Sequence, residues 1–112
     1  MALTAALIPS SNTVMYTSSA SAPVLGNAIT SIILCNTTGT AVNNINIYAV
    51  PNSAGAVGSA SSANQIVSSL SLPPNETLSL DQEKLVLVNN DTIVASAGTA
   101  SAVSMVISYL AV

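Results

Sequence analysis

The sequence predicts an all-β protein, and three observations support this fold class. Val, Ile and Thr account for 31 of the 112 residues, and these β-branched side chains fit a pleated strand better than a helix. The long polar residues that favour helices are scarce, with two Glu, two Gln and one Lys. The aliphatic runs are short and separated by Gly, Pro and Asn. This spacing is typical of a single antiparallel β-sandwich, jelly-roll or immunoglobulin-like, with about eight short strands.

The clearest strand is expected at residues 29–36. Because side chains alternate between the two faces of a strand, the pattern places Ile29, Ser31, Ile33 and Cys35 on one face and Thr30, Ile32, Leu34 and Asn36 on the other. Both faces carry aliphatic side chains. We therefore expect this strand to lie in the middle of a sheet.

The second clear strand, residues 43–50, alternates apolar and polar side chains, with Ile45 and Ile47 facing the core, and Pro51 ends it. Residues 51–64 are rich in Ser, Ala and Gly and are predicted to form a long loop that contacts a partner. The remaining predicted strands are residues 13–18, 65–72, 76–80, 84–88, 92–97 and 102–111.

The chain length is that of one domain, and the pattern divides it into two parts. Residues 29–112 are expected to form the β-sandwich. Residues 1–28 have weaker periodicity and are expected to form an extended N-terminal arm with a candidate edge strand at residues 13–18. Leu3, Leu7 and Ile8 are the large apolar residues of this arm that we expect to contact a partner.

Charged residues are scarce, because one Lys, no Arg and four carboxylates give a net charge of −3. An ordinary soluble domain carries about 25% charged residues, whereas this chain carries 4%. One cation cannot neutralise a row of phosphates, so nucleic acid is excluded as a partner, as is a basic helix lying on a membrane surface. A surface with so little charge repulsion tends to associate. The composition therefore indicates a chain that assembles.

Catalytic and metal sites are not expected. The sequence has no His and one Cys, so neither a zinc ligand set nor a nucleophile–His pair can be assembled. Glu76, Asp81, Glu83 and Asp91 are interpreted as turn or cap residues, and Cys35 as a small buried apolar residue. No metal or cofactor is predicted, and no segment has the 18 or more apolar residues that a membrane-spanning helix needs.

The three tyrosines are the only aromatic residues. Tyr109 falls on the inward row predicted for the last strand, together with Val103, Met105 and Ile107. Tyr48 lies on the less apolar face of its strand and is a candidate interface anchor. Without Trp or Phe there is little material for the stacking platform of a sugar-binding site, so a carbohydrate-binding module is the less favoured alternative.

Several of these strand–turn segments resemble a group of small virion proteins of tailed bacteriophages, cyanophages among them. The resemblance covers about three quarters of the chain, through residues 29–36, 47–51, 72–80, 85–87, 91–97 and 106–110. Members look like β-sandwich modules of the particle, and the resemblance implies a capsid decoration (cement) protein or a tail-associated protein. It assigns no functional residue, and the first 28 residues lie outside it.

We therefore predict a non-enzymatic structural protein of a bacteriophage virion, made in the host cytoplasm and placed on the outer surface of the capsid. It would stabilise the shell as a homo-oligomer, with a homotrimer favoured, bound to the major capsid protein. The predicted contact residues are Leu3, Leu7, Ile8, Tyr48 and Val57. A tail-associated adaptor or fibre module is the principal alternative.

Overall fold

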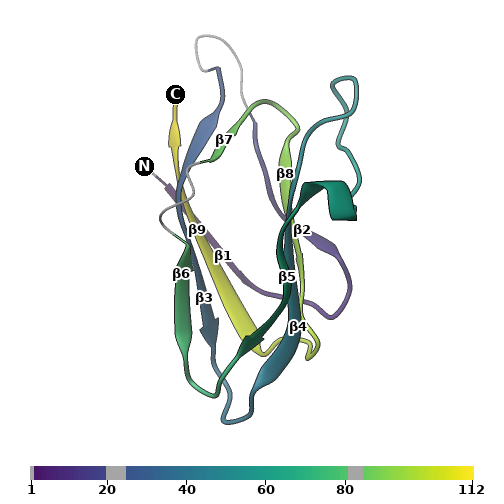
Figure 1. Ribbon diagram of the computed structural model, residues 1–112. Coiled ribbons are helices and arrows are strands. Elements are labelled where there is room, and N and C mark those ends of the chain that lie inside the picture. The colour runs from purple at the N-terminus through teal and green to yellow at the C-terminus, as the bar shows by residue number, and fades with distance from the viewer. Residues whose placement is uncertain (1, 20–24, 81–84) are drawn as a thin grey trace.

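The structure, a computed structural model, describes residues 2–19, 25–80 and 85–112. These residues form two antiparallel sheets packed together (Figure 1), which confirms the predicted all-β sandwich. All eight predicted strands are present, and β1 is an additional one. The elements are β1 (Ala2–Leu7), β2 (Thr13–Thr17), β3 (Asn27–Asn36), β4 (Val42–Val50), a 3₁₀ turn (Ser62–Asn64), β5 (Gln65–Leu72), β6 (Thr77–Leu80), β7 (Leu85–Leu87), β8 (Thr92–Ser96) and β9 (Val103–Ala111).

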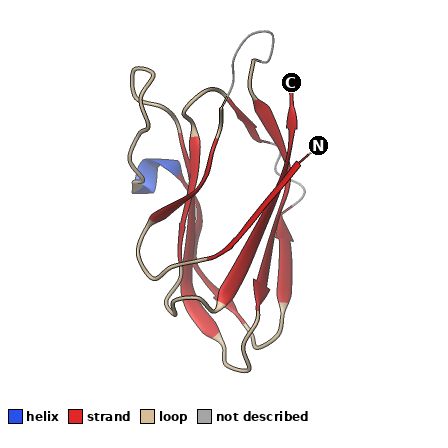
Figure 2. Cartoon of the chain, turned by 180° about the vertical axis from the view of Figure 1, so that it is seen from behind, coloured by secondary structure: helices blue, strands red, loops and turns tan. Residues whose placement is uncertain are grey.

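The strand order is that of a jelly roll. One sheet has the order β1-β9-β3-β6, and β7 also pairs with β3; the other has the order β2-β8-β4-β5. β6 and β7 pair in succession along one edge of β3, so they are equivalent to one interrupted strand. Counted in this way, the chain has eight strands and crosses from one sheet to the other at every connection except the one between β4 and β5, as in a jelly roll. Figure 2 shows the two layers and the loops that connect them from behind.

The core lies between the two sheets and is aliphatic. The inward row predicted for the last strand is confirmed, because Val103, Met105 and Ile107 are buried and Tyr109 packs against the core. Ile45 and Ile47 of β4 face them from the other sheet and are fully buried. Burying a side chain of this size contributes about 1.5–3 kcal/mol, so these rows contribute several kcal/mol to the attraction between the sheets.

The position of β3 in the middle of its sheet is confirmed, since it pairs with β9 on one side and with β6 and β7 on the other. Its predicted alternation is wrong at one point. Ile29 faces the core together with Ile32 and Leu34, because the register with β9 shifts between Ile29 and Ser31. Such a β-bulge inserts one residue and reverses the alternation that follows.

Hydrogen bonds hold this bulge in place. The hydroxyl of Ser108 in β9 lies 2.7 Å from the hydroxyl oxygens of both Thr30 and Ser31. One residue of β9 thus bonds two successive residues of β3, which is the two-against-one arrangement of a bulge. The sequence pattern contains no periodic signal for it.

The segment expected to be an arm contributes one edge strand to each sheet. β1 pairs with β9, and β2 pairs with β8. Both partners come from the last quarter of the chain, so local periodicity does not reveal this pairing. The sandwich therefore includes strands from both sides of the predicted boundary between residues 28 and 29.

Asn36 is a fully buried polar residue that joins three segments at one end of the sandwich. Its side-chain amide donates to the carbonyl oxygens of Thr40, Leu72 and Pro73 at 2.8, 3.1 and 3.1 Å. Its Oδ1 accepts from the backbone N–H of Thr38 at 3.0 Å and from the Thr38 hydroxyl at 2.7 Å. The end of β3, the following turn and the β5–β6 turn are fixed together by this one side chain.

We expect Asn36→Ala to lower the free energy of unfolding by roughly 2–4 kcal/mol, because buried backbone groups lose their partners. Urea denaturation followed by circular dichroism measures this change. Asn12→Ala, at an exposed position, is the matched control and should change stability by less than about 0.5 kcal/mol. Equal losses in the two variants would contradict the structural role of Asn36.

Tyr16 and Tyr109 form a tilted aromatic pair between the sheets, with ring centroids 4.7 Å apart and an interplanar angle of 39°. Both side chains are partly buried and pack against the core. Burial raises the pKa of the Tyr16 phenol above its ordinary value of 10.0; the charge of Tyr109 adds to the increase, and a hydrogen bond with Ser18 opposes it. The folded protein therefore retains this proton at a pH where the unfolded chain releases it.

This difference predicts a loss of stability in alkaline solution. Because the pKa of Tyr16 is higher in the folded state than in the unfolded chain, its contribution to the free energy of unfolding is fully present below about pH 10. This contribution is lost progressively as the pH rises through the pKa of the folded state. Denaturation midpoints measured between pH 8 and pH 12 should fall more steeply for the wild type than for Tyr16→Phe. Parallel curves for the two proteins would rule out this contribution of Tyr16.

Candidate interaction surface

One face of the molecule gathers many of its exposed apolar side chains. It is the outer side of the five-stranded sheet, and its residues follow from the strand registers and the alternation of side chains. We call this surface the outer face. It consists of Leu3, Ala5, Leu7, Ala28, Ser31, Ile33, Cys35, Thr77, Ser79, Val86, Ser104, Val106, Ser108 and Leu110.

The outer face carries aliphatic side chains from four strands, and none of the described residues that form it is charged. Leu3 of β1 is 69% exposed and Val86 of β7 is 64% exposed, and Ile33 and Leu110 are also exposed between them. Leu7 is exposed as well, and the other positions are Ala, Ser, Thr, Val and Cys. Exposed apolar side chains that gather on one face indicate a surface that another molecule covers.

The predicted contact residues lie on three different surfaces. Leu3 and Leu7 belong to the outer face, and Val57 is exposed on the loop between β4 and β5. Tyr48 is half-buried on the outer side of the four-stranded sheet. Ile8 is fully buried in the core, because it follows Leu7 by one residue and so points to the opposite side of the chain. Ile8 therefore acts within the fold.

Sequence reasoning missed the other exposed large apolar members of the outer face, namely Ile33, Val86 and Leu110. Their signal was present as alternation within each strand, but the sequence does not reveal which strands are neighbours. Cys35, expected to be buried, is also on this face and is partly exposed. The bulge in β3 causes this difference, because it turns Asn36 and Leu34 inward and leaves Cys35 outward.

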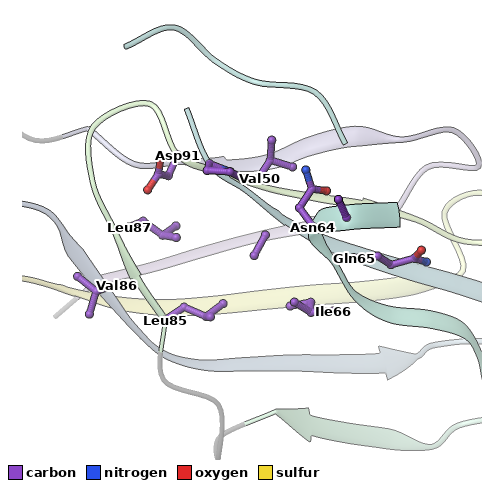
Figure 3. A pocket seen from close by; sticks show the side chains of 11 residues that line it. Val50, Asn64, Gln65, Ile66, Leu85, Val86, Leu87 and Asp91 are labelled. Carbon is purple, nitrogen blue, oxygen red and sulfur yellow. The ribbon is translucent and has the colours of Figure 1, made fainter. Parts of the chain in front are cut away.

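A second feature is an apolar crevice at the open side of the sandwich, where β5 and β7 belong to different sheets and do not pair. It has a volume of about 420 Å³, and Figure 3 shows its lining. Val50, Ile66, Leu85 and Leu87 supply its apolar walls, with the polar groups of Asn64, Gln65 and Asp91 at its border. A smaller hollow of about 140 Å³ shares Ile66 and Leu85 with it.

Asp91 is the carboxylate of this crevice, and its oxygens are occupied by the protein's own donors. Oδ1 accepts from the backbone N–H of Asn52 at 2.7 Å and from its side-chain amide at 3.0 Å. Oδ2 accepts from the backbone N–H of Val88 at 2.9 Å. The backbone N–H of Asp91 also closes a turn onto the carbonyl of Val88. These contacts confirm Asp91 as a turn residue that fixes the start of the loop after β4.

The remaining candidate groups for chemistry are dispersed. Glu76 is exposed at the turn before β6, far in the chain from Asp91, whereas Asp81 and Glu83 lie outside the described residues. In the described part of the chain, no three His, Cys, Asp or Glu residues lie close enough to hold a metal ion. Two of the tyrosines stack on each other between the sheets, which leaves Tyr48 as the aromatic residue on an outer surface.

Comparisons with known proteins found no matching family model, no similar curated protein and no similar solved structure. Among the described residues, no helix has the length and apolar character needed to span a membrane.

We expect Asp91→Ala to destabilise the protein by about 3 kcal/mol, because three donors lose a charged acceptor. Hydrogen exchange should accelerate at the amides of Asn52 and Val88 before other amides respond. Glu76→Ala removes an exposed carboxylate and serves as the control, with little expected change. Unchanged exchange at Asn52 in Asp91→Ala would show that other contacts hold this loop.

Proposed function

We propose that this protein is a structural component of a virion that binds a neighbouring protein through its outer face. The observation that supports this proposal is that the face exposes Leu3, Ile33, Val86 and Leu110, and that none of the described residues that form it is charged. A partner that covered these side chains would remove apolar area from water. Each 100 Å² of apolar area contributes about 2.5 kcal/mol before the costs of association.

The chemistry of the outer face selects the class of partner. Nucleic acid requires several cations, whereas the whole chain has one Lys and no Arg. A small polar ligand requires a cavity with convergent donors and acceptors, whereas these residues form the side of a sheet. A protein surface with its own aliphatic and small polar side chains fits best, because such interfaces need neither charge nor a pocket.

Two further considerations support a particle as the site of action. Jelly rolls occur in viral capsid proteins, although a fold alone does not determine function. The strand–turn segments resemble small virion proteins of tailed phages. A capsid decoration protein bound to the major capsid protein on the outside of the shell combines these features, since a repeating lattice multiplies weak single contacts. The homotrimer expected from the sequence stays a prediction.

A tail-associated adaptor or fibre module is the second candidate, because it would use the same uncharged face. The number of copies separates the two roles. A decoration protein covers the shell in hundreds of copies, whereas a tail module is present in a few rings. Quantitative mass spectrometry of purified virions of the phage that carries this gene measures this ratio.

The outer face itself is tested by adding recombinant protein to virions that lack it. Val86→Lys places a charge on the face at a largely exposed position, and we expect binding to fall at least tenfold because the lysine loses its hydration at the contact. Val57→Lys, equally a charge on an exposed valine, is the matched control and should bind as the wild type does. Loss of binding in Val57→Lys alone would move the contact to residues 51–64, and absence of the protein from virions would refute the proposed function.

A further inference from the structure

The edges of the two sheets differ in how well they are protected against pairing with another chain. Natural edge strands avoid such pairing through bulges, short length, charges or proline. β2 and β5 have interrupted registers, and β5 contains Ser69 at a φ of 51°. β6 and β7 have four and three residues. β1 pairs with β9 over six consecutive residues without a shift, and it contains neither a charge nor a proline.

The free edge of β1 presents a definite set of backbone groups. At its end, the N–H of Ile8 donates to the carbonyl of Val103 at 2.8 Å, and the carbonyl of Ile8 accepts from the N–H of Ser101 at 3.1 Å. Ile8 therefore directs both groups toward the β9 side. In an antiparallel ladder, alternate residues direct both groups to the same neighbour. Thr4 and Ala6 thus face β9, whereas Leu3, Ala5 and Leu7 direct their N–H and C=O groups away from it.

We propose that β1 pairs with β1 of a second copy of this chain, antiparallel and about a two-fold axis at Ala5. In this register Ala5 lies opposite Ala5 of the second copy, and Leu3 lies opposite Leu7. All three residues with free backbone groups then face their counterparts, and three such pairs form about six hydrogen bonds. If the register is shifted by two residues, only two hydrogen-bonded pairs remain. If it is shifted by one residue, residues with free backbone groups lie opposite residues whose backbone groups point toward β9.

The side chains agree with the same register. Leu3 and Leu7 are exposed in the single chain, by 69% and 47%, and the two-fold axis places each Leu3 beside Leu7 of the other copy on the outer face. Ala5, at the axis, is small enough for the strands to meet there. Thr4 faces Ala6 of the other copy on the opposite side of the sheet. Because β1 contains no charged side chain, no repulsion between like charges opposes the approach of the two strands.

The pair would join two five-stranded sheets into one and continue the outer face across both copies. This pairing is isologous, because the same strand serves both partners, and it therefore closes as a dimer. The geometry of β1 favours this two-fold assembly over the homotrimer expected from the sequence. The inference does not rest on the proposed role in a virion, because it concerns the purified protein alone.

Sedimentation equilibrium of the wild type and of Ala5→Pro tests the pairing. Proline removes the N–H of residue 5, which faces the free edge, and so leaves the hydrogen bonds with β9 intact; edge strands tolerate proline at such positions. We expect the wild type to be a dimer and Ala5→Pro to dissociate at least 100-fold more readily. Ala5→Ser keeps the N–H and is the matched control, with dimerisation expected to match the wild type.

A cross-link keeps the test decisive if Ala5→Pro fails to fold. Opposed residues of a hydrogen-bonded pair have Cα atoms about 5.5 Å apart, within disulfide range. In a Cys35→Ser background, Ala5→Cys should form a disulfide-linked dimer on mild oxidation, whereas Thr99→Cys, at an exposed turn, should remain single. A monomeric or trimeric wild type, a folded Ala5→Pro that still dimerises, or equal cross-linking at both positions would overturn the proposal.

Discussion

The contact between two aliphatic rows, one from each sheet, is the interaction on which the rest of the structure depends. Ile32, Leu34 and Ile107 of one sheet and Ile45 and Ile47 of the other are buried together, and they hold the sheets face to face. Because side chains alternate along a strand, fixing these rows inward also fixes which residues point outward. The composition of the outer surface is thus a consequence of how the core is packed.

Few of the described residues that point outward are charged, and the outer sides of the two sheets differ in how much apolar surface they expose. The five-stranded sheet exposes aliphatic side chains from β1, β3, β7 and β9, whereas the four-stranded sheet is partly covered on its outer side, where Val94 is buried. Leu3 and Leu7 belong both to the outer face and to the free edge of β1. Contacts with a partner protein and contacts between copies would therefore form one continuous surface.

Polar side chains stabilise the ends of the sandwich. Asn36 fixes the turns at one end, and Asp91 fixes the loop after β4 to the turn before β8. Each side chain forms hydrogen bonds with buried or partly buried backbone groups that lie outside the hydrogen-bonded strands. Buried turns require such bonds because an unpaired backbone group away from water is unfavourable. The carboxylate of Asp91 thus has a structural role, although it borders the crevice between β5 and β7.

The sequence by itself determined the fold class, the approximate bounds of eight strands, the inward row of β9 and the central position of β3, because these depend on local periodicity and composition. Only the tertiary structure decided which strands are neighbours, that residues 2–17 complete an edge of each sheet, and that Ile8 enters the core. It also placed the bulge that turns Ile29 inward and Cys35 outward. Strand pairing joins residues about 100 positions apart, as Leu3 with Ser108, and a bulge depends on the pairing of two distant strands. Neither feature changes the local alternation of apolar and polar residues, so the sequence pattern does not reveal them.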